Sequence, residues 1–150
     1  MTVWGASRLK VCMSRILVAV SSPFAAQRVV DAVGDLAKKL AAEVLVVHVS
    51  RPSGGQMRDQ EEADGEKSIA ALRDKLQERG VAVQTLLLFS DDIARAILNT
   101  AQERDVTVIV LGMTGKNVFA RLLAGNVPVE LIKNTKIPVI LLPPDWNGGL

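Results

Sequence analysis

The apolar residues of this chain gather into five short runs, separated by longer segments that mix polar and apolar positions. Within most runs the apolar residues are continuous rather than alternating, which is typical of strands buried on both faces of a parallel sheet. We therefore predict five strands, over RILVAV (15–20), EVLVVHV (43–49), VAVQTLLLF (81–89), VTVIVLG (106–112) and IPVILL (137–142).

The segments between the runs place their apolar residues three and four positions apart, which predicts helices with one apolar face. Gly80 is a predicted C-cap, and Ser90 or Asp91 is a predicted N-cap. The segment 51–60 holds a proline and a glycine pair and is predicted as a loop, and a short last helix is predicted over about 126–134. The predicted apolar stripes are Ala26, Val30, Val33, Ala37 and Leu40, then Ile69, Leu72 and Leu76, and finally Ile93, Ile97 and Ala101.

Strands that alternate with helices predict an α/β fold, an open five-stranded parallel sheet with helices on both faces. We expect the strand order 3-2-1-4-5, in which the winding reverses between the first and the fourth strand. Sheets of this kind bind ligands at such a reversal, beyond the carboxyl ends of the strands. The loops that leave the sheet there are SSP (21–23) and GMTG (112–115), so we expect a ligand site between them.

Met13 stands almost directly before the first predicted strand, and MSRILVAV reads as a natural start for the domain. We therefore divide the chain into an N-terminal extension (1–12), one α/β domain (13–145) and a C-terminal tail (146–150). A chain of 150 residues of which 49% are hydrophobic is long enough for a single domain with a proper core.

Charge and composition argue against several classes of function. The 18 basic and 16 acidic residues give a net charge of +2, and only 3% of the residues are aromatic, so we expect no nucleic-acid interface. One cysteine, Cys12, and one histidine, His48, argue against a disulfide framework and a metal site. We interpret His48 as a packed or hydrogen-bonded core residue. No apolar run approaches the roughly 20 residues of a membrane span, and we expect a cytoplasmic protein.

Three glycines follow the fourth predicted strand, namely Gly112, Gly115 and Gly125. They do not form a P-loop, because that motif spaces its glycines farther apart and places Ser or Thr after its lysine. Without a Cβ, glycines let backbone N–H groups approach a ligand closely, and a helix mouth at Gly125 and Asn126 favours an anion. In the structural alternative, the glycines are strand-exit and capping residues, and spacing alone leaves both interpretations open.

The wider spacing of these glycines, with two residues and then nine between them, resembles the nucleotide signature of the universal stress protein family. The segments ILVAV, VVHV, SDDIARAIL and IPVILLPP resemble further landmarks of that family and come in the same order, so the resemblance extends from Ser14 to Pro144. It implies an adenine nucleotide alpha hydrolase-like fold and a dimeric stress-response or regulatory module that binds ATP or AMP.

The resemblance implies phosphate contacts from main-chain N–H groups, and base and ribose contacts from the ends of the first two strands. Two positions depart from the family pattern: Asn126 stands where nucleotide-binding members carry Ser or Thr, and Ser21 stands where they carry an aspartate. The implied binding residues are Ala19, Val20, Ser21, Val49, Gly112, Gly115, Gly125, Asn126 and Val127.

No constellation of nucleophile, base and orienting acid is visible, so we predict no catalytic residues and at most slow ATP hydrolysis. The two departures keep a second hypothesis open, a family member that binds no nucleotide and acts through contacts with an unidentified protein partner. A phospho-receiver domain is disfavoured. Its acidic pocket after the first strand is replaced by SSP, and LLPP stands where its lysine is expected after the last strand.

The last strand predicts a homodimer. The segment from Pro138 to Leu142 is strongly apolar and forms an edge of the sheet in the expected strand order. An exposed apolar edge is an aggregation hazard unless it is paired, and pairing with the same strand of a second copy about a two-fold axis satisfies both edges. Family members that this chain resembles commonly form such dimers.

Overall fold

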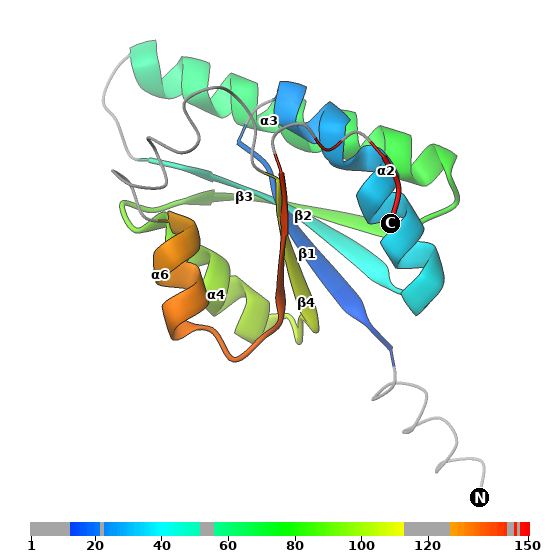
Figure 1. The fold of residues 1–150 in the computed structure, drawn as a ribbon. Helices are drawn as coiled ribbons and strands as arrows, with labels where there is room; N and C mark the ends of the chain where they lie inside the picture. Colours follow the sequence, from blue (N-terminus) through cyan, green and yellow to red (C-terminus); the bar gives the residue numbers. More distant parts are fainter. Residues whose placement is uncertain (1–12, 22, 52–55, 113–126, 144–145, 147) are drawn as a thin grey trace, which may run out of the picture.

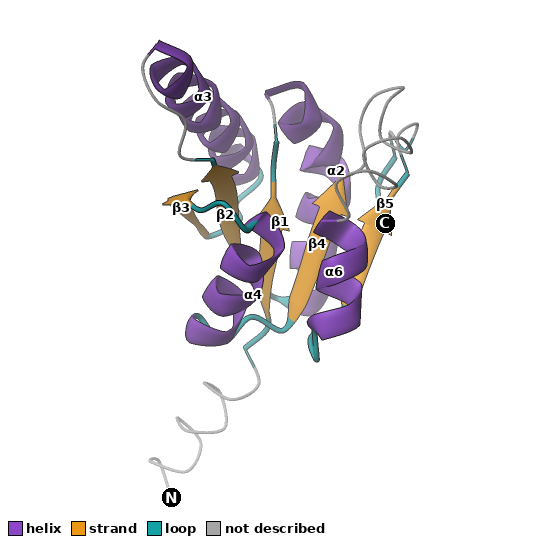
Figure 2. Cartoon of the chain, turned by 90° about the vertical axis from the view of Figure 1, so that its left-hand side faces the viewer, coloured by secondary structure: helices purple, strands orange, loops and turns teal. Residues whose placement is uncertain are grey.

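The computed structural model describes residues 13–21, 23–51, 56–112, 127–143, 146 and 148–150. A five-stranded sheet in the order β3-β2-β1-β4-β5 forms its middle layer, and every neighbouring pair of strands is parallel. Helices α2 and α3 cover one face, and α4 and α6 cover the other (Figures 1 and 2). This arrangement confirms the fold class and the strand order predicted from the sequence.

The strands follow the apolar runs, with small differences at their ends. The central strand β1 is flanked by β2 and β4, so that Leu17 pairs with both Leu45 and Ile109. All three side chains are almost fully buried, as expected for strands covered by helices on both faces. The strands are β1 (Arg15–Ala19), β2 (Glu43–Ser50), β3 (Val83–Phe89), β4 (Val108–Gly112) and β5 (Val139–Leu142).

The helices confirm the predicted periodicity but correct one boundary. Helix α3 starts at Gln56, inside the segment 51–60 that the sequence analysis assigned to a loop. Only the first half of that segment contains the proline and the glycine pair; the second half has residues compatible with a helix, and Asp59 suits the positive end of the helix dipole. The helices are α2 (Pro23–Leu40), α3 (Gln56–Glu78), α4 (Ile93–Glu103) and α6 (Val127–Asn134).

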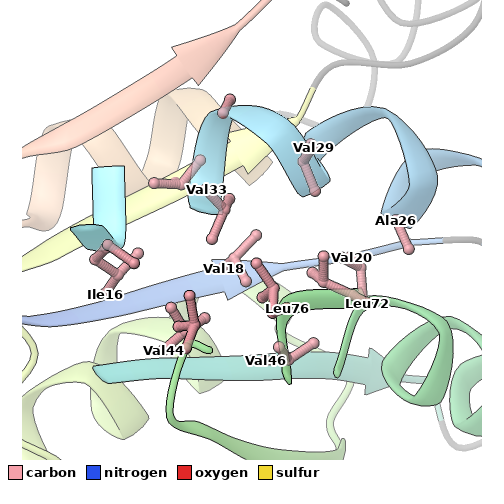
Figure 3. Close-up of a cluster of buried hydrophobic side chains, with 14 of the residues drawn as sticks. Ile16, Val18, Val20, Ala26, Val29, Val33, Val44, Val46, Leu72 and Leu76 are labelled. Atoms are coloured by element: carbon pink, nitrogen blue, oxygen red, sulfur yellow. The ribbon is translucent and has the colours of Figure 1, made fainter. Parts of the chain in front are cut away.

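Alternation of side chains along the strands divides the core into two clusters. The α2/α3 cluster lies between the sheet and helices α2 and α3, and it includes Ile16 and Val18 of β1 (Figure 3). The α4/α6 cluster lies on the opposite face and includes Leu17 of the same strand. Each fully buried side chain of this size contributes about 1.5–3 kcal/mol relative to an exposed one, so both faces of the sheet stabilise the fold.

Three helices end on residues with left-handed backbone conformation. Gly80, with φ of 79°, follows α3, and its conformation confirms the C-cap prediction. Ala41 (φ 49°) follows α2, and Asp105 (φ 54°) lies just after α4. Left-handed conformation is costly for residues with a Cβ, so the turn after α2 stores strain that the turn after α3 avoids.

Helix α4 starts at an aspartate cap. The Asp92 side chain accepts a hydrogen bond from the backbone N–H of Arg95 at 3.0 Å. The sequence pattern predicted this cap at Ser90 or Asp91, one or two residues too early. The Ser90 hydroxyl instead forms a local turn, in which it donates to the carbonyl and accepts from the N–H of Asp92.

Helices α2 and α3 are joined by an arginine. The Arg79 guanidinium donates to the carboxylates of Asp35 at 2.7 Å and Asp31 at 3.2 Å, and to the Val30 carbonyl at 3.3 Å. It lies over Gly34, where an added Cβ would stand 2.6 Å from its central carbon. The glycine therefore provides the space that this group of contacts occupies.

Candidate functional site

The carboxyl ends of β1 and β4 lie side by side in the centre of the sheet. Ala19, the last residue of β1, pairs with Leu111 of β4. The strand that follows β1 in the chain, β2, lies on one side of this pair, and the strand that follows β4, β5, lies on the other (Figure 2). The winding of the fold reverses between them. Parallel α/β sheets bind ligands at such a reversal, and Ser21 and Gly112, the first residues of the two predicted exits, lie at these strand ends.

The end of β1 presents different surfaces to the two faces of the sheet. Ala19 is half-buried against the α4/α6 cluster, whereas the Val20 side chain is only 6% exposed and belongs to the α2/α3 cluster. Ser21 is exposed. Since the Val20 side chain is occupied in the core, this residue can meet a ligand only through its main chain, and Ser21 is the first side chain free to do so.

Val49 lies on the neighbouring strand, two residues beyond the partner of Ala19. The register pairs Ala19 with Val47, and alternation puts Val47 and Val49 on the same face of β2. Ala19 and Val49 both pack beside the α4/α6 cluster and remain half-buried. Two of the predicted base contacts therefore lie on the same face of neighbouring strands.

Gly112 ends β4, and its lack of a side chain has a packing reason. A Cβ added at Gly112 would lie 2.7 Å from the Cγ1 atom of Val29 on α2, closer than such atoms approach without a shift. The glycine thus lets α2 pack against the end of β4. Its backbone is at the same time one of the exits at the winding reversal, so the packing role and a ligand role are compatible.

Most of the remaining predicted phosphate contacts belong to the part of the chain that the structure does not describe. Gly115, Gly125 and Asn126 are outside the described residues, and Val127 is the first residue of α6. Glu130 stands in the first turn of that helix, where a carboxylate already interacts favourably with the helix dipole. An anion at this helix mouth would therefore have to share the dipole with Glu130.

Two polar residues at the same edge were not predicted as parts of a site. His48 is half-buried, and its Nδ1 atom lies 2.7 Å from the Val20 carbonyl oxygen, which confirms a hydrogen-bonded histidine. Ser50 is only 4% exposed, and its hydroxyl has no hydrogen-bond partner among the described residues. The alternation of β2 turns both residues away from Val49, a pattern that is visible in the sequence once the strand is placed.

No group of three or more histidine, cysteine, aspartate or glutamate side chains in the described parts of the chain is arranged to hold a metal ion. The helices that the structure describes include none with the length and apolar character required to cross a membrane.

A family model described as the universal stress protein family matches residues 13–143. The chain belongs to this family. Its relatives include universal stress protein YxiE of Bacillus subtilis, which is 25% identical over 146 residues, covering 86% of this chain and 98% of YxiE. The resemblance inferred from the glycine spacing and the strand landmarks is thereby confirmed.

Solved structures of universal stress proteins share this fold. One from Archaeoglobus fulgidus in complex with dAMP is 25% identical, with a TM-score of 0.68, and the alignment covers 85% of this chain and 96% of that one. A universal stress protein in complex with cAMP is 18% identical, with a TM-score of 0.69 and coverage of 88% and 98%. The second likeness concerns the fold alone.

Proposed function

We propose that this universal stress protein binds an adenine nucleotide, ATP or AMP, between the exits of β1 and β4. The observation that carries the proposal is a pair of half-buried apolar side chains, Ala19 and Val49, on one face of β1 and β2. They lie beside the winding reversal, where β1 and β4 end. The dAMP complex of the Archaeoglobus fulgidus relative supports the choice of ligand class.

The two ends of the nucleotide require different chemistry. A flat, apolar base suits the half-buried face of Ala19 and Val49. The second lone pair of the Val20 carbonyl and the exposed Ser21 hydroxyl would lie toward the ribose. The phosphates would be bound by backbone N–H groups freed by small residues and a helix start. In this proposal the phosphate contacts are Gly112, Gly115, Gly125, Asn126 and Val127.

The proposal is one of binding rather than turnover. The described residues at this edge include one histidine, His48. Its Nδ1 atom is engaged by the Val20 carbonyl and its Nε2 atom lies against Gly65 of α3, so the ring is held between Val20 and that helix. A general base must reach the group that it deprotonates. Any hydrolysis of ATP is expected to be slow.

Calorimetric titration of the purified protein with ATP and AMP tests this function. Replacing Gly115 by aspartate would place a negative charge where the phosphates are proposed, and we expect a loss of affinity of more than about tenfold. Gly148→Asp is the matched control because residue 148 lies in the C-terminal tail. The proposal fails if the unmodified protein binds neither nucleotide at millimolar concentration, or if both variants bind like it.

A second function has its own support, a dimeric protein that works through apolar contacts. Strand β5 is an edge of the sheet, and Leu141 on it is 38% exposed. Val129 (39%) and Ile132 (49%) add exposed apolar surface on α6. We propose that β5 pairs with the β5 strand of a second copy, because pairing about a two-fold axis covers both edges. Without nucleotide binding, such a surface remains available for contacts with a protein partner.

A further inference from the structure

We propose that His48 is a positioning residue for the candidate nucleotide site. Its imidazole holds the end of β1 in place, and Gly65 of α3 provides the space in which the ring lies. The effect on nucleotide affinity rests on the proposed function, whereas the effect on the exit of β1 does not. The two are therefore separable by experiment.

The direction of the hydrogen bond defines the state of the ring. The Nδ1 atom of His48 lies 2.7 Å from the carbonyl oxygen of Val20. A carbonyl oxygen only accepts, so Nδ1 must carry the hydrogen. In the neutral imidazole the hydrogen is therefore on Nδ1 and the lone pair on Nε2, the tautomer selected by this contact.

This contact fixes the residue at which β1 stops pairing as a strand. The Val20 N–H donates to the Val47 carbonyl at 2.9 Å, while the Val20 carbonyl accepts from the His48 side chain. The main-chain N–H and carbonyl of Val20 are thus both hydrogen-bonded to β2. The next residue is Ser21, the first exposed side chain of the proposed site, so its starting point and direction depend on the bond from His48.

Helix α3 and strand β3 confine the ring on its other side. A Cβ added at Gly65 would stand 2.4 Å from Cδ2 and 2.9 Å from Nε2 of His48, and 3.1 Å from Cδ1 of Leu87. Glycine is unfavourable inside a helix, yet α3 carries one at this position. The absent Cβ allows the ring to reach Val20, and its neighbours prevent it from moving toward α3.

The same strand therefore serves the site in two ways. Val49 faces the α4/α6 cluster and is proposed to contact the base, while His48, one residue earlier, faces α3 and supports the β1 exit. A residue that acts through Val20 need not contact the nucleotide itself. Positioning of this kind affects ligand affinity because the bound geometry is formed before the ligand arrives.

The chain contains a single histidine, so one imidazole spin system in a nitrogen-15 NMR spectrum reports the contact without ambiguity. We expect the neutral ring to carry its hydrogen on Nδ1, and we expect the backbone amide of Val20 to exchange slowly with solvent. A neutral ring with the hydrogen on Nε2 would overturn the proposal at once.

Variants separate the hydrogen bond from the bulk of the side chain. His48→Asn keeps a donor at the δ position, His48→Leu removes it, and Gly65→Ala displaces the ring while leaving His48 itself unchanged. We expect nucleotide affinity to fall about tenfold in His48→Leu and Gly65→Ala and to stay within about twofold of the original in His48→Asn. Exchange of the Val20 amide should accelerate in His48→Leu and Gly65→Ala only.

Val81→Ala is the control for lost stability, because Val81 is buried near the opposite, amino edge of the sheet. If His48 were purely structural, each of the three variants would lose nucleotide affinity only in proportion to its loss of stability, as Val81→Ala does. That result would contradict the proposal. If the unmodified protein binds no nucleotide, the proposed function fails. The Val20 exchange pattern across the same variants then decides the positioning role by itself.

Discussion

Gly112 ends β4 where Val29 of α2 approaches it, and its contribution to stability can be measured apart from any ligand. We predict that Gly112→Ala destabilises the fold by about 1–3 kcal/mol, because the new methyl group would overlap the Cγ1 atom of Val29. The overlap follows from a separation of 2.7 Å between the added Cβ and that atom. Urea denaturation followed by circular dichroism provides the measurement.

The matched control for Gly112 is the same substitution in a protein that carries Val29→Ala. Removing the valine methyl groups makes room for the new Cβ, so the added cost of Gly112→Ala should largely disappear in that background. An unchanged cost in both backgrounds would show that the approach of Val29 is not what excludes a side chain at position 112.

The residues with left-handed backbone conformation lead to a second prediction. Ala41 has φ of 49° directly after α2, in a position that glycine occupies without steric cost. We expect Ala41→Gly to stabilise the protein by about 0.5–1 kcal/mol, measured as a higher midpoint of urea denaturation with an unchanged slope.

Gly80 provides the reverse experiment at the end of α3. Its φ is 79°, and an added Cβ would meet no atom within 4 Å. The cost of Gly80→Ala, which we expect to be about 1 kcal/mol, therefore comes from the backbone alone. If neither substitution changed stability, the left-handed conformation of these two turns would be wrong.

Among the elements, α2 and α3 are joined through Arg79, and the pair Arg79 and Gly34 permits a test by double substitution. Alanine favours a helix interior over glycine by about 1 kcal/mol, but a Cβ at Gly34 would lie 2.6 Å from the guanidinium carbon. We predict that Gly34→Ala stabilises α2 only in a protein that also carries Arg79→Ala. In the otherwise unchanged protein the gain should vanish or become a loss.

The expected size of the arginine contribution is small. The Arg79 side chain is 25% exposed, and its partners Asp31 and Asp35 are 67% and 33% exposed, so solvent screens much of the attraction and each pair contributes at most about 1 kcal/mol. Thermal denaturation of the two single variants and the double variant gives the coupling. Strict additivity would mean that Arg79 does not occupy the space above Gly34.

The strands could be predicted from the sequence, whereas several boundaries and contacts could not. Residues such as Ile16, Leu17 and Val18 are buried on alternate faces of one strand, and a continuous apolar run reports that situation directly. The cap of α4 was misplaced because neighbouring residues have similar capping chemistry, and only the structure shows that Asp92 accepts from Arg95.

For the molecule as a whole, the exposed edge of the sheet predicts self-association. Replacing Leu141, which is 38% exposed on β5, by lysine places a charge on that edge, a feature that prevents strands from pairing. We expect sedimentation velocity to show a dimer for the unmodified protein and a monomer for Leu141→Lys. Leu40→Lys is the control, because Leu40 is similarly exposed at 41% but ends α2. Equal association of all three proteins would rule out the β5 interface.

The location of the candidate site follows from the sequence, but its internal supports do not. Strand order determines where the winding reverses. Alternation of strands and helices predicts a parallel sheet but is compatible with more than one order, and the structure confirms the expected order 3-2-1-4-5. The contact from His48 to Val20 and the approach of Val29 to Gly112 join residues distant in the chain. Such pairs have no periodic pattern, so they emerge only when the elements are packed.

The connection from β4 to α6 differs in length from those that lead from helices into strands. Those that lead from a helix into the next strand are short, spanning 41–42, 79–82, 104–107 and 135–138, whereas the connection from β4 to α6 is the segment 113–126. Because β4 and α6 are held in the core by residues such as Ile109 and Leu131, we expect that the segment between them can be exchanged for that of a relative without loss of the fold. We therefore expect such an exchange to alter the proposed nucleotide affinity while the sheet keeps its order and packing.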